Sequence, residues 1–267
     1  MKKLHITLPV ALGALAVWLA LTLGGGWLAS GGRQQSLAEP TGGAIGWPWA
    51  LAALFAAALA LASADRQGAG LGAPAPLNSI RLVWLPLLYT LLMLFIAWAG
   101  DLPPRAVVLV VACNSALVAL SEELMFRAIL LQGLLDRYAV WPAVLGSSAI
   151  FGVVHAANGL ATGDFDAALW QAVAAGLQGV AYAAIRLRTR SVWPMVVVHG
   201  LWDFALVTSV LSATAQGETS ILPYAALIAV LPLCLYGLYL LRGTRGRTVP
   251  VKPESRGVFA RFARRRA

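Results

Sequence analysis

Ser121-Glu122-Glu123-Leu124-Met125-Phe126-Arg127 places two adjacent carboxylates and an arginine inside a long apolar part of the chain. Residues 106–120, which precede this stretch, contain no aspartate, glutamate, lysine, arginine or histidine. An ionisable side chain at the centre of a membrane helix costs about 2.5–3.5 kcal/mol on insertion, so such residues tend to have partners and a function. The stretch therefore predicts a membrane helix that contributes to a functional site, whose other members should lie on other apolar segments.

The composition of the chain is that of a polytopic membrane protein. Hydrophobic residues make up 60% of its 267 residues and charged residues only 12%, whereas a soluble domain has about 25% charged residues. We therefore predict an all-α fold, a transmembrane helix bundle embedded in a lipid bilayer. The bundle should form a single domain over residues 1–241, with the motifs in a core at 106–210, followed by a basic tail at 242–267.

Eight apolar segments approach the length of about 20 residues that a spanning helix needs. The first follows Lys2 and Lys3 and could be a cleaved signal peptide, but its length and the lack of a clean Ala-x-Ala site after it favour an uncleaved anchor. Polar, glycine-containing loops are expected at 30–43 and 158–166, which assigns Asn158 to a loop rather than to a substrate site. The predicted spans are 5–29, 45–64, 82–100, 106–135, 140–157, 167–185, 192–210 and 222–241.

The distribution of basic residues predicts the orientation of the bundle. With the N-terminus inside and eight crossings, the inner segments hold 18 of the 20 lysines and arginines, as the positive-inside rule expects. Both termini are therefore predicted to be cytoplasmic. The tail from Arg242 to Arg266 holds nine of these basic residues. After a hydrophobic helix, such a cluster marks the cytoplasmic side or an anionic lipid surface, so no nucleic-acid partner is expected.

Two later segments carry ionisable residues that can act as partners of Glu122. His155 ends the apolar run 151–155, and His199 precedes Asp203 by four residues, so these two side chains share one helix face. A rise of about 1.5 Å per residue places Glu122 and His155 about 20 Å from the inner ends of their helices, and His199 about 10 Å from the inner end of its own. The three side chains are thus expected to meet only approximately.

These side chains can form a structural ion pair, and they allow two alternative kinds of chemistry: activation of water or binding of a metal ion. Glu123 and Arg127 form an i, i+4 pair in the favourable order and should neutralise each other as structural support. Glu122 lies about 100° further around the helix and is free to point elsewhere. A carboxylate and a histidine can activate a water molecule, and the histidine–aspartate pair can stabilise an oxyanion. Alternatively, a carboxylate and two histidines can bind a divalent metal such as Zn²⁺, with Glu122, His155 and His199 as the candidate ligands.

Taken together, the three motifs resemble those of the CPBP family, the CAAX proteases and bacteriocin-processing enzymes, also called the Abi family. The family pattern is EExxxR, then FxxxH, then HxxxN or HxxxD, on separate helices. The resemblance covers about residues 115–204, and no HExxH, GxSG or GxGD signature of other intramembrane proteases occurs. The matching motifs in this chain are Glu122-Glu123…Arg127, Phe151…His155 and His199…Asp203.

The resemblance implies an eight-helix intramembrane endopeptidase. Its eukaryotic relatives remove the last three residues of prenylated CAAX proteins, and in their favoured mechanism the residues matching Glu122 and His155 activate water. The residues matching His199 and Asp203 form the oxyanion site. Many members are named metalloproteases, which makes Zn²⁺ a candidate cofactor. An ionised aspartate cannot donate a hydrogen bond as asparagine does, so Asp203 is expected to orient His199 or to bind a cation.

The sequence therefore predicts an intramembrane peptidase that acts on a membrane-associated peptide or protein. Two other functions fit the same residues. One is a non-catalytic scaffold or immunity-type protein that retains the helix core of the family, and the other is a small proton-coupled transporter. The alanine-, leucine- and arginine-rich composition is typical of a bacterium of high GC content. This predicts a location in the bacterial cytoplasmic membrane, where prenylated CAAX substrates are not expected.

Overall fold

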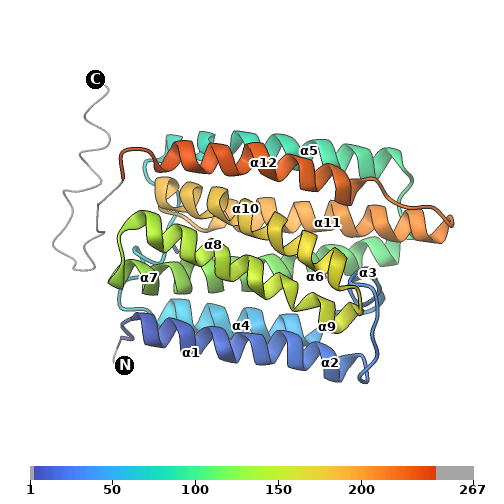
Figure 1. Ribbon diagram of the computed structural model, residues 1–267, viewed down its shortest axis with the longest axis horizontal. Helices are drawn as coiled ribbons and strands as arrows, with labels where there is room; N and C mark the ends of the chain where they lie inside the picture. The colour runs from blue at the N-terminus through green and yellow to red at the C-terminus, as the bar shows by residue number, and fades with distance from the viewer. Residues whose placement is uncertain (1–2, 245–267) are drawn as a thin grey trace.

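The computed structural model describes residues 3–244, which form helices joined by short connections (Figure 1). The predicted all-α fold is confirmed, and no strand forms within these residues. Two of the elements, η1 and η3, are π-helices, and η2 is a 3₁₀-helix. In chain order the elements are α1 (Leu8–Leu19), η1 (Ala20–Gly24), α2 (Gly25–Ala29), α3 (Ala38–Gly43), α4 (Trp47–Ala62), η2 (Leu77–Val83), α5 (Trp84–Ala99), α6 (Arg105–Glu123), η3 (Leu124–Leu130), α7 (Leu131–Arg137), α8 (Val140–Ala156), α9 (Asn158–Thr162), α10 (Phe165–Thr189), α11 (Trp193–Ala215) and α12 (Leu222–Leu241).

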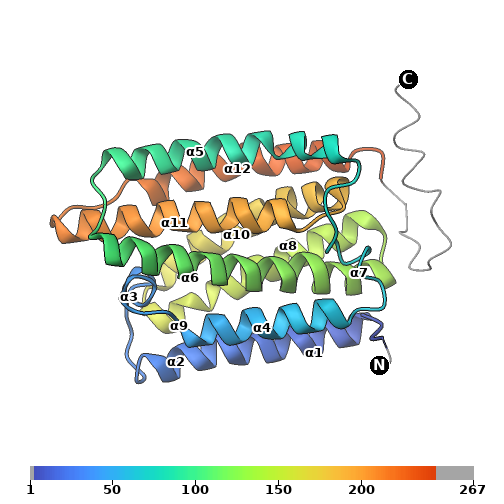
Figure 2. The same ribbon diagram turned by 180° about the vertical axis from the view of Figure 1, so that it is seen from behind.

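The long helices form two layers that pack against each other. In Figure 1, α8, α10 and α12 run side by side in the front layer. Figure 2 shows the second layer from behind, with α4, α6, α11 and α5 as successive neighbours. The segment from α6 through η3 to α7 lies between the layers over its second half, because residues 123–135 are all buried. The motif Ser121–Arg127 therefore lies at the centre of the bundle.

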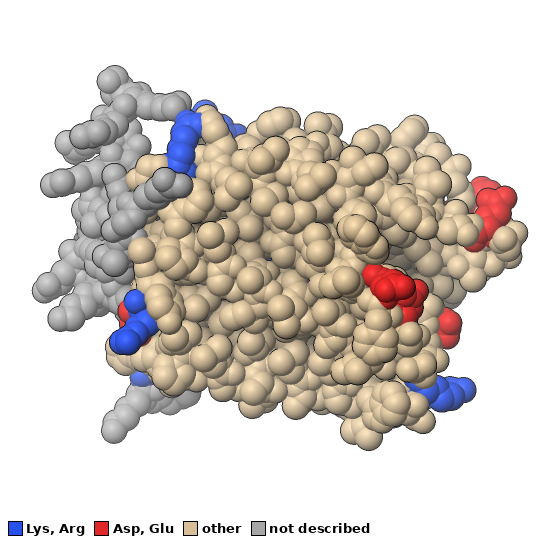
Figure 3. Space-filling model, viewed as in Figure 1, with Lys and Arg blue, Asp and Glu red and all other residues tan. Residues whose placement is uncertain are grey.

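The two ends of the bundle differ in charge. The end where α1 begins and α12 ends is called the basic end, and the opposite end, with α2, α3 and α9, is called the acidic end (Figures 1 and 3). Among the described residues, the basic end has Lys3, Arg66, Arg81, Arg137, Arg186, Arg188, Arg190 and Arg242, with Asp65 and Asp136. The acidic end has Glu39, Asp101, Asp164, Asp166 and Glu218, with Arg33 and Arg105.

Seven helices within residues 3–244 are long and apolar enough to cross a membrane. The remaining predicted span is α4, which is apolar but has 16 residues. This is about 24 Å at a rise of 1.5 Å per residue. The chain is thus a multi-pass membrane protein whose described residues contain seven candidate spans and one shorter apolar helix. The cytoplasmic location of both termini stays a prediction, and residues 245–267 of the predicted basic tail lie outside the described residues.

A long central helix carries the acidic motif, as the sequence predicted. It runs from Arg105 to Arg137 without interruption, but residues 124–130 adopt a π-helical turn, η3. Such turns occur mostly as single bulges in α-helices and are frequent at functional sites. Here the π turn begins immediately after Glu123 and contains Arg127. The backbone irregularity of this helix therefore begins within the motif and extends to Leu130.

The connector between α4 and η2 covers the start of α11 at the basic end. Val192 donates its backbone N–H to the Gly70 carbonyl at 2.9 Å, and Ala75 donates to the Thr189 carbonyl at 2.9 Å. The indole N–H of Trp193 reaches the Leu71 carbonyl at 2.8 Å. Residues 189, 191 and 192 are fully buried. The start of the helix that carries His199 is therefore covered by the connector on one side, while its first residue, Trp193, is exposed.

Small residues let α8 pack closely against α10. A Cβ atom added at Gly152 would lie 2.6 Å from the Ala172 carbonyl oxygen, and one at Gly179 would lie 3.2 Å from the Cα of Ser148. Helices in membranes associate through van der Waals contacts of this kind, because lipid provides no hydrophobic force between them. The close approach of α8 and α10 holds His155 at a fixed position relative to the rest of the bundle.

Gly152→Ala should destabilise the protein, because the new methyl group would overlap the backbone of α10. Overpacking typically costs about 1–3 kcal/mol, which should lower the thermal unfolding midpoint in detergent. Gly146→Ala is the matched control on the same helix, since its Cβ would meet Leu134 at an ordinary 3.9 Å. Equal midpoints for the two variants would contradict close packing at Gly152.

Candidate active site

Glu122 lies at the centre of a cluster of ionisable side chains from three helices. Its Oε2 is 3.9 Å from Nε2 of His155 on α8 and 3.7 Å from Nε2 of His199 on α11. The Glu122 side chain is 13% exposed, and Oε2 has no hydrogen-bond partner among the described residues. A buried carboxylate oxygen without a partner is rare in a folded protein and calls for a functional explanation.

The ring of His155 is oriented by its own helix. Its Nδ1 lies 2.8 Å from the backbone carbonyl oxygen of Phe151, one turn earlier. A carbonyl oxygen only accepts hydrogen bonds, so Nδ1 is the donor in this contact. In the neutral ring, Nε2 then carries the lone pair, and it is this atom that faces Glu122. The phenylalanine of the FxxxH motif thus contributes its carbonyl as well as its ring to the site.

His199 is held by two carboxylates. Its Nδ1 donates to Oε1 of Glu123 at 2.9 Å, and its Nε2 lies 3.4 Å from Oδ2 of Asp203, one turn further along α11. The contact with Asp203 is compatible with the expected orienting role of this residue, and its role, including the alternative of binding a cation, stays a prediction. The contact with Glu123 was not predicted, because the sequence assigned Glu123 to Arg127 alone.

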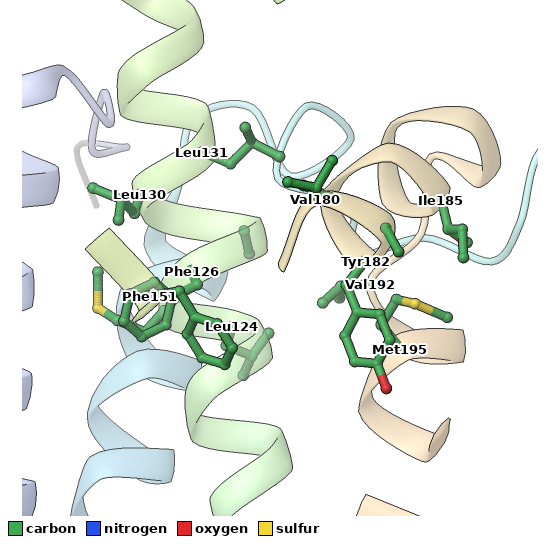
Figure 4. Packing of buried hydrophobic residues seen from close by; sticks show 14 of the residues in the cluster. Leu124, Phe126, Leu130, Leu131, Phe151, Val180, Tyr182, Ile185, Val192 and Met195 are labelled. Carbon is green, nitrogen blue, oxygen red and sulfur yellow. The ribbon is translucent and has the colours of Figure 1, made fainter. Parts of the chain in front are cut away.

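Glu123 and Arg127 form the predicted ion pair. Nε of Arg127 is 3.3 Å from Oε2 of Glu123, and both side chains are fully buried. The guanidinium group also lies 4.2 Å from the centre of the Phe151 ring, where a cation is attracted by the face of the π-system. Figure 4 shows this part of the core, with Phe126 and Phe151 on one side and Tyr182 on the other. Aromatic rings and one carboxylate thus surround the buried cation.

The structure brings together every ionisable residue that the sequence placed in the site: Glu122, Glu123, Arg127, His155, His199 and Asp203. The expected mismatch in depth does not occur. The depth count assumed that the helix of His199 begins at the membrane surface, whereas α11 begins beneath the connector 63–76. The roles of the six side chains in catalysis stay predictions, since geometry alone assigns proximity and orientation.

A cavity of about 720 Å³ reaches two members of the cluster, Glu122 and His155. Asn158 also lines it, at the start of the short helix α9 and not in a loop as the sequence predicted. The Asn158 amide donates to Oε1 of Gln171 on α10 at 2.9 Å. From the sequence, Asn158 could be a loop residue or a polar group of the substrate site, and the loop was the favoured interpretation. Its position three residues after His155 was the available signal, because this spacing keeps both residues on one helix face.

The predicted metal ligands do not form a ready binding site. Within residues 3–244, no group of three or more histidine, cysteine, aspartate or glutamate side chains is arranged to hold a metal ion. Glu122 and the two histidine Nε2 atoms do converge, and the Nδ1 contact of His199 with Glu123 resembles the carboxylate–histidine arrangement of metal sites. Zn²⁺ as a cofactor therefore stays a prediction.

Comparison with known families gives a match over the part of the chain that contains the site. Residues 104–205 match the family model described as Rce1-like, the type II CAAX prenyl endopeptidases. The match contains all six residues of the ionisable cluster. This part of the chain is therefore an Rce1-like domain of the CPBP family, as the three motifs predicted. No curated protein and no solved structure was found to match the chain.

Arg127→Met should strongly destabilise the protein, because it leaves the Glu123 carboxylate buried without its cation. Breaking a buried pair in this way costs about 3–5 kcal/mol, measurable as a lower unfolding midpoint in detergent. Arg137→Met, on the exposed end of α7, is the matched control and should have little effect. Adding Glu123→Gln to Arg127→Met should restore much of the loss, because glutamine is neutral and its oxygen still accepts from His199. No restoration would show that the charge is not the cause.

Proposed function

We propose that the protein is an intramembrane endopeptidase that hydrolyses a peptide bond of a membrane-associated substrate with a water activated by Glu122 and His155. The observation that supports this most directly is the placement of Oε2 of Glu122 and Nε2 of His155, 3.9 Å apart at the base of a cavity. The Rce1-like family match supports the same reaction class. The composition supports a location in a bacterial cytoplasmic membrane.

The pair provides the geometry for activating water. At 3.9 Å the two atoms are too far apart for a direct hydrogen bond, and both are acceptors when Glu122 is ionised and His155 is neutral. One water molecule can donate a hydrogen bond to each of them. As its oxygen attacks the carbonyl carbon of the substrate, the water gives a proton to Glu122, which acts as the general base.

The opposite side of the cluster can stabilise the negative charge that develops on the substrate. Nε2 of His199 points towards Glu122, while Nδ1 is fixed by Glu123. A protonated ring between these carboxylates would place positive charge beside the tetrahedral intermediate. The Asp203 carboxylate, 3.4 Å from the same Nε2, would also favour the protonated ring. When the intermediate collapses, the C–N bond breaks and Glu122 returns its proton to the leaving amine.

Glu122→Gln and His155→Ala should each lower cleavage by about 10²–10⁴-fold, the usual contribution of general acid–base catalysis. The measurement uses purified protein in liposomes with a panel of single-span peptides that carry apolar juxtamembrane segments. Unchanged unfolding midpoints would show that the variants are folded.

Two outcomes would count against the peptidase. Equal cleavage by wild type and variants would exclude Glu122 and His155 as the catalytic pair. A Glu122→Gln variant that fully replaces the wild type in cells would favour the scaffold function, and proton-coupled uptake of a solute by the liposomes would favour the transporter.

The role of Zn²⁺ is decided by chelation. We expect cleavage to persist after treatment with a strong chelator, because the proposed steps use only protein side chains and water. Loss of cleavage that is restored by added Zn²⁺ would instead assign Glu122, His155 and His199 as metal ligands. Direct measurement of bound metal before and after treatment is the control, since incomplete removal would mimic independence.

A further inference from the structure

The cavity above Glu122 is built mainly from the part of the chain that precedes the Rce1-like match. Its walls include Trp18 and Trp27 from the first span and Trp47 and Trp49 from the start of α4, all before residue 104. From Glu122 the cavity extends to residues 35–46 and to α9, which lie at the acidic end (Figure 1). No lining residue comes from the connections at the basic end.

The mouth of this cavity is held in place by specific contacts. The buried amide of Asn114 on α6 donates to the carbonyl oxygens of Thr41 and Ala44 at 2.9 and 2.8 Å, and its oxygen accepts from the Gly46 N–H at 2.9 Å. The Gln35 N–H donates to the Ala161 carbonyl at 3.1 Å and ties the same segment to α9. The mouth is thus part of the fold, and residues 35–46 frame it.

Charge indicates which side of the membrane this mouth faces. Among the described residues the basic end has eight basic and two acidic side chains, and the acidic end has two basic and five acidic ones. Figure 3 shows this separation on one face of the molecule. Basic residues near the ends of spans remain on the cytoplasmic side. The acidic end, and with it the cavity mouth, then lies on the extracytoplasmic side.

We propose that the substrate enters from the extracytoplasmic side, as an extended apolar peptide segment that occupies this cavity and reaches Glu122. This inference rests on the peptidase function proposed above and adds the side of entry and the class of substrate. The ionisable residues of the lining are Glu122 and His155 at the base and Arg33 and Glu39 near the mouth. A segment without charged side chains fits the apolar space between them.

A polar side chain in the lining suits a peptide backbone. The Asn158 amide is fixed by Gln171, and it has a second N–H and a carbonyl oxygen that can hydrogen-bond to a backbone. Trp18 also lines the cavity, but its indole N–H is buried from solvent and is therefore not available as a contact for a bound peptide.

Cysteine accessibility tests the side of entry. Ala157→Cys places a thiol in the cavity lining next to His155, in a protein whose Cys113 and Cys234 are replaced by alanine. A charged, membrane-impermeant methanethiosulfonate reagent is then added to right-side-out or to inverted membrane vesicles. We expect modification from the outer face and not from the inner one. The matched control is Gln67→Cys, exposed in the connector at the basic end, which should react only in inverted vesicles.

Protection experiments test the occupant. A single-span peptide with an uncharged apolar segment on its outer side should slow the modification of Ala157→Cys, and modification should in turn stop cleavage of that peptide. Protection without cleavage would support the cavity assignment while the peptidase function fails. Modification only from the inner face would overturn the proposal. Protection by added short-chain phospholipid but not by the peptide would make the cavity a lipid site and would also overturn it.

Discussion

The buried ion pair between Glu123 and Arg127 is the constraint on which the rest of the structure depends. Neither side chain touches water, so each charge needs its partner within a medium of low dielectric constant. Glu123 also receives the Nδ1 hydrogen bond of His199, and Arg127 stacks against Phe151. One pair therefore fixes three helices relative to one another. Glu122 remains beside it with an unpaired oxygen, available for chemistry.

Much of the fold and most members of the site could be predicted from the sequence. Apolar length located the spans, and the cost of charge in hydrocarbon singled out residues such as Glu122 and His199. The predicted depth of His199 was wrong, because the length of an apolar segment does not reveal where its helix begins within the bundle. That depth depends on backbone hydrogen bonds from Val192 to Gly70 and from Ala75 to Thr189, which join segments far apart in the sequence.

The cavity could not be predicted from sequence patterns, for a different reason. Its mouth depends on Asn114. In the sequence this residue is a single polar side chain in an apolar run, and nothing there indicates its partners. In the structure this side chain makes three hydrogen bonds to the segment 41–46. Helix periodicity describes how single elements face a core, whereas a cavity arises from the space that several connections leave between elements. The short helices α3 and α9 escaped prediction in the same way.

The length of α4 has a consequence for the lipid around it. Its apolar stretch of 16 residues spans about 24 Å, some 6 Å less than a hydrocarbon core of about 30 Å. Lipid next to a helix that is too short thins to match it. The first turn of α4 carries Trp47 and Trp49, which line the cavity mouth, and indole rings settle at the headgroup level. Hydrophobic mismatch thus brings the lipid headgroups closer to the mouth, and it would shorten the path of the proposed peptide substrate through the acyl chains.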